Sequence, residues 1–105
     1  MRTSDFFEKL YSVATAYRWT VDNKKVNATI QSGPLRGCQL NPITALAHKS
    51  GLGFFENNRE DTVYAASLLG IPRKFARQIY SATIGNNNHG NTQVVRGRIR
   101  SALEV

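Results

Sequence analysis

The stretch Thr62–Tyr80, TVYAASLLGIPRKFARQIY, has the clearest structural pattern in this 105-residue sequence. Gly70 can adopt the left-handed backbone conformation in which many helices end. Pro72 follows at once, and proline suits the first turn of a helix, where its missing N–H has no partner to lose. The pattern predicts two helices, at residues 57–69 and 72–84, joined by a tight turn.

Upstream of this stretch, the spacing of apolar residues predicts a helix, then a hairpin, then a second helix. The first helix, at 4–17, has an apolar stripe with the spacing i, i+4, i+7 and i+11. From residue 18 to residue 31 apolar and polar residues alternate around a polar turn, as in a β-hairpin. Asn41-Pro42 is a helix start and predicts a helix that ends at Ser50-Gly51. The stripe of the first helix consists of Phe6, Leu10, Val13 and Tyr17.

Two further expectations complete the fold. Asn57 with Glu60 resembles a capping box at the start of the 57–69 helix, whose buried side would carry Val63, Ala66 and Leu69. Residues 92–103, with Asn91 as cap, predict a final helix. We therefore expect a mainly α fold, with residues 1–105 forming one small helical bundle of about five helices and a short N-terminal β-hairpin.

The 62–80 stretch resembles the helix-turn-helix motif of DNA-binding domains. Ala66 matches the small residue at which the two helices cross, and Gly70 matches the turn glycine four positions later. The resemblance implies that the second helix is a recognition helix, which lies in the major groove of DNA. Ala76 and Phe75 depart from the motif, and the same residues also suit an ordinary packed helical corner.

The charge of the chain is positive and uneven. There are 14 Lys and Arg residues against 7 Asp and Glu, a net charge of +7. Residues 71–105 hold six basic residues and one acidic residue, so this third alone carries +5. A balance of this kind favours an anionic partner. The candidate nucleic-acid-binding residues are Arg73, Lys74, Arg77, Tyr80, Arg96, Arg98 and Arg100.

Residue types that carry catalysis or bind metal are sparse. Cys38 is the only cysteine, and His48 and His89 are the only histidines. A Cys/His nucleophilic pair would have to be assembled by the fold, and no local motif supports one. We expect no enzymatic activity, no cofactor and no metal site. The single cysteine also favours a reducing compartment, so we expect a cytoplasmic protein.

These observations favour a small basic binding protein, with DNA or RNA as its partner. The alternative is a protein–protein interaction or adaptor module of bacterial or phage origin, which binds an acidic protein. No apolar run approaches the length of a membrane span, so we expect no membrane partner.

Overall fold

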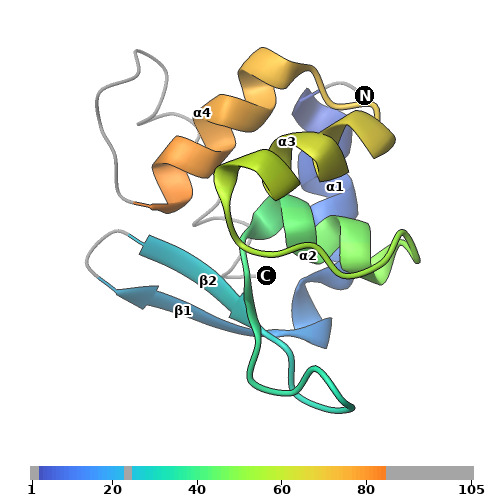
Figure 1. Cartoon of the computed structure of the whole chain (residues 1–105). Helices are drawn as coiled ribbons and strands as arrows, with labels where there is room; N and C mark the ends of the chain where they lie inside the picture. The colour runs from blue at the N-terminus through green and yellow to red at the C-terminus, as the bar shows by residue number, and fades with distance from the viewer. Residues whose placement is uncertain (1–2, 23–24, 85–105) are drawn as a thin grey trace.

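Helices and a small sheet share the described part of the chain (Figure 1), which in this computed structural model comprises residues 3–22 and 25–84. The helices are α1 (Thr3–Val13), α2 (Pro42–Lys49), α3 (Arg59–Leu68) and α4 (Arg73–Thr83), with a short 3₁₀ helix, η1 (Ala14–Ala16), after α1. The strands are β1 (Arg18–Asp22), β2 (Lys25–Thr29) and β3 (Gln39–Leu40). Within the described residues, no helix is long and apolar enough to cross a membrane.

The predicted fold class is wrong, because the described residues combine four helices with a three-stranded antiparallel sheet. The hairpin expected at 18–31 is present as β1 and β2, with Trp19 opposite Ala28. The sequence analysis missed β3, which pairs with the other edge of β2 and places Leu40 opposite Ala28. A strand of two residues is too short for alternation to be visible. The helix predicted at 92–103 lies outside the described residues.

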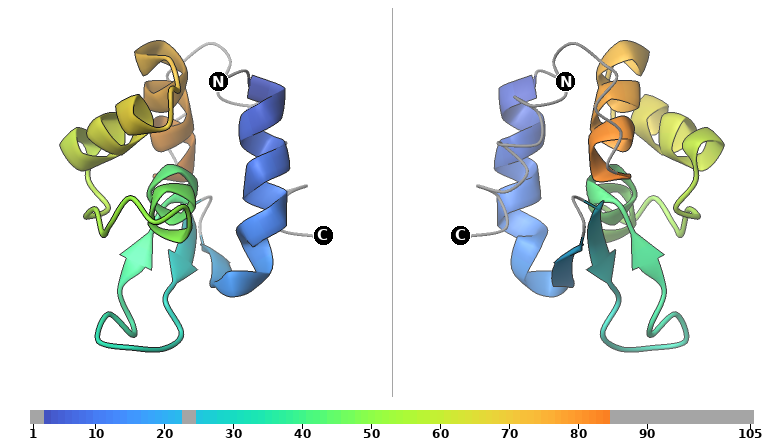
Figure 2. Two further views of the ribbon diagram at one scale, coloured as in Figure 1. Left: turned by 90° about the vertical axis from the view of Figure 1, so that its right-hand side faces the viewer. Right: turned by 90° about the vertical axis from the view of Figure 1, so that its left-hand side faces the viewer.

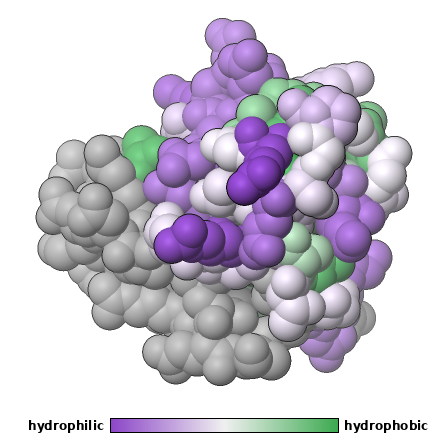
Figure 3. All heavy atoms as spheres, turned by 90° about the horizontal axis from the view of Figure 1, so that it is seen from below, coloured by the Kyte–Doolittle hydropathy of each residue, from purple (hydrophilic) through white to green (hydrophobic). Residues whose placement is uncertain are grey.

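A loop closed by backbone hydrogen bonds brings β3 back to the sheet. The N–H of Ile30 donates to the carbonyl of Cys38 at 3.0 Å, and that of Gly37 donates to the carbonyl of Ile30 at 2.9 Å. These bonds fix the register in which Leu40 reaches β2. The described part of the face over the strands and this loop is mostly hydrophilic (Figure 3).

The first helix is shorter than predicted. It ends at Val13, and η1 then turns the chain, so that Tyr17 leaves the helical stripe. Phe6 and Leu10 are buried in the main core, whereas Tyr17 packs in a second cluster with Ala28 and Leu40. The change of helix type therefore lets one apolar stripe supply two clusters.

The main core lies where the four helices meet. Figure 2 shows α1 on one side of the molecule and α3 on the other, with α2 and α4 between them. Ile43 and Leu46 from α2 and Ile79 from α4 are buried at the centre. Phe55 packs against this core, whereas its neighbour Phe54 is 39% exposed.

The turn between α3 and α4 follows from Gly70, as the sequence predicts. Gly70 has φ of 74°, and the N–H of Ile71 donates to the carbonyl of Ala66 at 2.9 Å. This is the Schellman arrangement, in which the residue after the left-handed position satisfies a carbonyl of the last turn. Ile71 is buried beyond the turn and holds the start of α4 against the core.

Asn41 joins the helices to one another through its buried side-chain amide. Its Oδ1 accepts from the N–H groups of Ile43 and Thr44, which caps α2. Its Nδ2 donates to Thr62 Oγ1 of α3 at 2.7 Å and to Asn57 Oδ1 at 2.9 Å. Both donors and both acceptor positions of the amide are thus used.

The cap of α3 is one residue later than predicted. Asn58, not Asn57, accepts a hydrogen bond from the backbone N–H of Asp61, at 2.8 Å. Asn57 instead contacts Asn41 and donates to Asn27 of β2 at 3.3 Å. The predicted cap residue therefore serves in the tertiary contact between sheet and helices.

We expect Asn41→Ala to lower the free energy of unfolding by about 3 kcal/mol, since it removes a helix cap and leaves buried polar groups without partners. Asn58→Ala is the matched control, because it removes an exposed cap, for which we expect a loss of about 1 kcal/mol. Urea denaturation followed by Trp19 fluorescence measures both. Equal losses in the two variants would contradict the special role of the buried amide.

Candidate functional site

The candidate binding residues of α4 are mostly exposed. Arg73, Lys74 and Arg77 are exposed, whereas Tyr80 is half-buried. Arg73 and Arg77 are one helical turn apart, so they lie on the same side of α4. Tyr80 is thus less available to a partner than the sequence suggests.

Ala76 and Ile79 form the fully buried side of α4. Phe75 is only partly buried, at the edge of the main core. On α3 the buried residues are Ala65 and Ala66, while Val63, expected to be buried, is half-exposed. Small side chains at the crossing let α3 and α4 approach closely.

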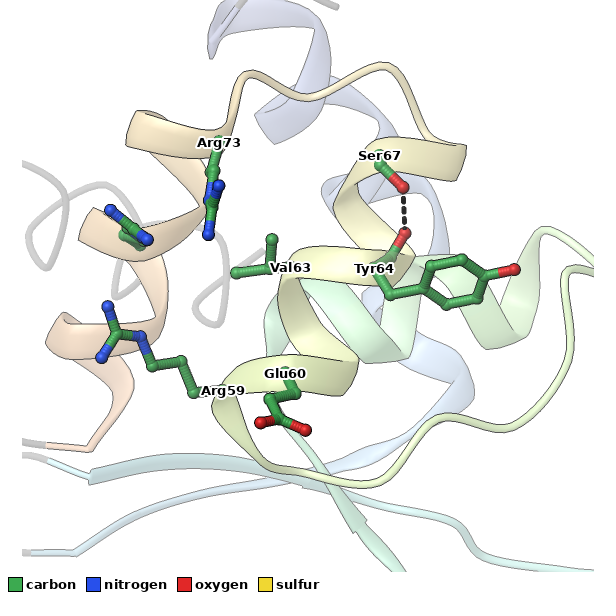
Figure 4. A pocket seen from close by; sticks show the side chains of 7 residues that line it. Arg59, Glu60, Val63, Tyr64, Ser67 and Arg73 are labelled. Carbon is green, nitrogen blue, oxygen red and sulfur yellow. Dashed lines mark hydrogen bonds between the residues drawn. The ribbon is translucent and has the colours of Figure 1, made fainter.

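A groove of about 590 Å³ runs between the outer faces of α3 and α4. Arg73 and Arg77 line it from α4, and Arg59 lines it from the first turn of α3. Figure 4 shows Arg59 extending from α3 toward α4, and Arg73 pointing into the space between the two helices. The remaining lining residues are Glu60, Val63, Tyr64 and Ser67.

Three arginines and one glutamate give the groove a net charge of +2. Arginine keeps its charge at every physiological pH, and its planar group can donate two parallel hydrogen bonds to a phosphate or carboxylate. Among the described residues, none of the three guanidinium groups forms an ion pair with a carboxylate. Their charge and hydrogen-bond donors are therefore available to an anionic partner.

The sequence analysis missed Arg59. At the start of α3, Arg59 resembles any solvent-exposed arginine at a helix end. Its position in the sequence does not indicate that it lies near Arg73 and Arg77. The three come together only because α3 and α4 cross. Lys74 does not line the groove. The candidate residues Arg96, Arg98 and Arg100 lie outside the described residues.

The exposed side of α3 also carries apolar side chains. Tyr64 is 59% exposed and Leu68, one turn later, is 47% exposed. The Tyr64 ring lies at an angle of 63° to that of Phe55, with 5.8 Å between ring centroids. The only hydrogen bond of the Ser67 hydroxyl among the described residues is donated to the backbone carbonyl of Tyr64. The exposed side of α3 therefore carries an aromatic ring and a leucine one turn apart, and of these two only Tyr64 lines the groove.

A tyrosine–histidine pair lies elsewhere, between η1 and the end of α2. Tyr17 Oη is 2.6 Å from His48 Nδ1 and donates to the carbonyl of Ala45 at 3.2 Å. Both hydrogen bonds form together when His48 carries a proton on Nδ1. In that tautomer Nδ1–H donates to Tyr17 Oη, and the phenol O–H donates to the carbonyl of Ala45. Burial raises the pKa of Tyr17 above its ordinary value of 10.0. Tyr17 is 6% exposed, so this pair belongs to the packing between η1 and α2.

Cys38 is partly buried against the second apolar cluster, the one that contains Tyr17. Within the described part of the chain, no hydrogen bond joins Cys38 to His48. Over the same residues, no group of three or more His, Cys, Asp and Glu side chains could hold a metal ion. His89 lies outside these residues. The arginine groove is thus the strongest candidate site that the structure describes.

Compared with models of protein families, with curated proteins and with solved structures, the chain has no match in sequence or in structure. A functional assignment therefore depends on the residues of the site itself.

We expect Tyr17→Phe to lower the free energy of unfolding by about 1–2 kcal/mol at neutral pH, because it removes the hydrogen bonds of the phenol with Ala45 and His48. In the wild type, the raised pKa of Tyr17 means that this stabilisation is complete below pH 10.0 and is lost as the pH rises through the folded-state pKa. The deficit of the variant should therefore shrink above pH 10.0. Urea denaturation across this range measures it.

Tyr64→Phe is the control for this experiment, because it removes an exposed phenol from the same chain. We expect its stability to follow the wild-type pH profile. A Tyr17→Phe deficit that stays constant through the alkaline range would show that the buried phenol does not cause the alkaline loss.

Proposed function

We propose that this protein is a nucleic-acid-binding protein, without catalytic activity, that contacts phosphate groups through the groove between α3 and α4. The observation that carries the proposal is the convergence of three arginines from two helices on one open groove. Phosphate oxygens match the donor geometry of guanidinium groups. Contacts of this kind account for most of the affinity of proteins for nucleic acids at moderate salt.

Two further features support the proposal. The chain as a whole carries a charge of +7, which favours association with a polyanion. The stretch that resembles a helix-turn-helix motif folds as two helices joined by a turn in which Gly70 is left-handed. Arg73 and Arg77 belong to the second of these helices, which the resemblance would make the recognition helix.

An acidic protein is the second candidate partner. Tyr64 and Leu68 are exposed on α3, and protein interfaces combine apolar anchors with arginine. Copurification with one stoichiometric protein, unchanged after nuclease treatment, would favour this partner. Loss of the copurifying material on nuclease treatment would favour nucleic acid.

The test of the proposal is binding of the full chain to labelled oligonucleotides, measured by fluorescence anisotropy from about 50 mM salt upward. We expect binding that weakens steeply with salt. Arg59→Ala, Arg73→Ala and Arg77→Ala should each weaken binding about 10-fold, because a hydrogen bond to a charged group contributes about 1.5 kcal/mol. Each should also reduce the slope of log affinity against log salt by about 1.

Arg36→Ala is the matched control. Arg36 is exposed and does not line the groove. It belongs to the loop before β3, which lies away from α3 and α4 (Figure 1), so its loss changes the net charge equally but leaves the groove intact. We expect this variant to bind nearly as well as the wild type. If Arg36→Ala were as damaging as the groove variants, or if no salt-sensitive binding occurred, the proposed site would be wrong.

A further inference from the structure

The arginines of α4 line a concave surface rather than a protruding edge. A helix reads duplex DNA by entering the major groove, so that side chains on its outermost face reach the base edges. On α4, Arg73 and Arg77 border the groove shared with α3, and Gln78 is half-buried. A cationic concave surface of this kind instead suits a single strand, whose flexible backbone can follow the groove.

Tyr64 adds an aromatic surface at the rim of the same groove. The residue is 59% exposed, and its ring lies on the outer side of α3, pointing away from α4 (Figure 4). The edge contact with Phe55 gives this ring a fixed neighbour on one side. Single-strand-binding proteins combine cations that contact phosphates with aromatic rings on which bases stack, and the arginines and Tyr64 supply these two elements to one groove.

We propose that the nucleic acid bound by this protein is single-stranded, with its backbone in the α3–α4 groove and one base stacked on Tyr64. The inference rests on the proposed function of the groove. To reach the ring, a base has to turn over the α3 wall of the groove. An unpaired base can do so, whereas a base in a duplex would first have to leave its stack and its pairing partner.

The experiment compares labelled oligo-dT and oligo-U of about 15 nucleotides, a length within the site sizes of single-strand-binding folds, with a dA·dT duplex of the same length. We expect the wild type to bind at least one single strand more tightly than the duplex. The two single-stranded probes distinguish DNA from RNA.

Tyr64→Ala should weaken single-strand binding about 5-fold or more, the effect expected from the loss of one stacked base. Tyr64→Phe keeps the ring and should retain wild-type affinity. Leu68→Ala truncates an exposed apolar side chain one turn along α3, outside the groove lining, and should change little. Circular dichroism of each variant verifies that the helices are intact.

Two results would overturn the inference. One is duplex binding as tight as binding to both single strands, and the other is a Tyr64→Ala variant that binds like Leu68→Ala. In either case arginine-dependent, salt-sensitive binding would still support the groove as a nucleic-acid site. If neither single strand nor duplex showed salt-sensitive binding, the proposed function would fail as well, and an acidic protein would be the remaining partner.

Discussion

The buried amide of Asn41 is the contact on which the positions of the other elements depend. A single side chain caps α2, donates to Thr62 of α3 and contacts Asn57, which in turn contacts β2. A buried amide is stable only when its donors and acceptors are all paired, so the network tolerates one relative placement of these segments. Apolar packing alone is less selective, because it accepts many arrangements of similar volume.

The groove follows indirectly from the way Asn41 positions the helices. Asn41 fixes the start of α3, the Schellman turn at Gly70 fixes the direction of the chain, and alanines at the crossing set how closely α4 approaches. Like charges on neighbouring helices repel one another, so three arginines around one groove do not stabilise the fold by themselves. An arrangement that fold stability does not explain is a reasonable place to look for function.

Local signals in the sequence were enough to predict where α2 begins and where α3 ends, but not where α1 ends or which asparagine caps α3. Pro42 begins α2 and Gly70 ends α3 because each acts through its own backbone geometry. Features that depend on contacts between residues far apart in the sequence could not be predicted from local signals. The two-residue strand β3 exists only because a loop returns it to β2, and this strand makes the fold mixed rather than mainly helical. Arg59 joins the candidate site only through the crossing of α3 and α4.

The distribution of charge along the sequence is also a weaker guide to the candidate binding surface than its distribution in the folded protein. Lys74 belongs to the basic last third of the sequence yet does not line the groove, whereas Arg59 comes from the nearly balanced first part and does. What a phosphate encounters is the set of donors within reach, and the strength of such contacts falls steeply with distance and with screening. The affinity of this protein for a phosphate-bearing partner should therefore depend more on the three guanidinium groups of the groove than on the net charge. Removing one arginine inside the groove and one outside it separates these two effects.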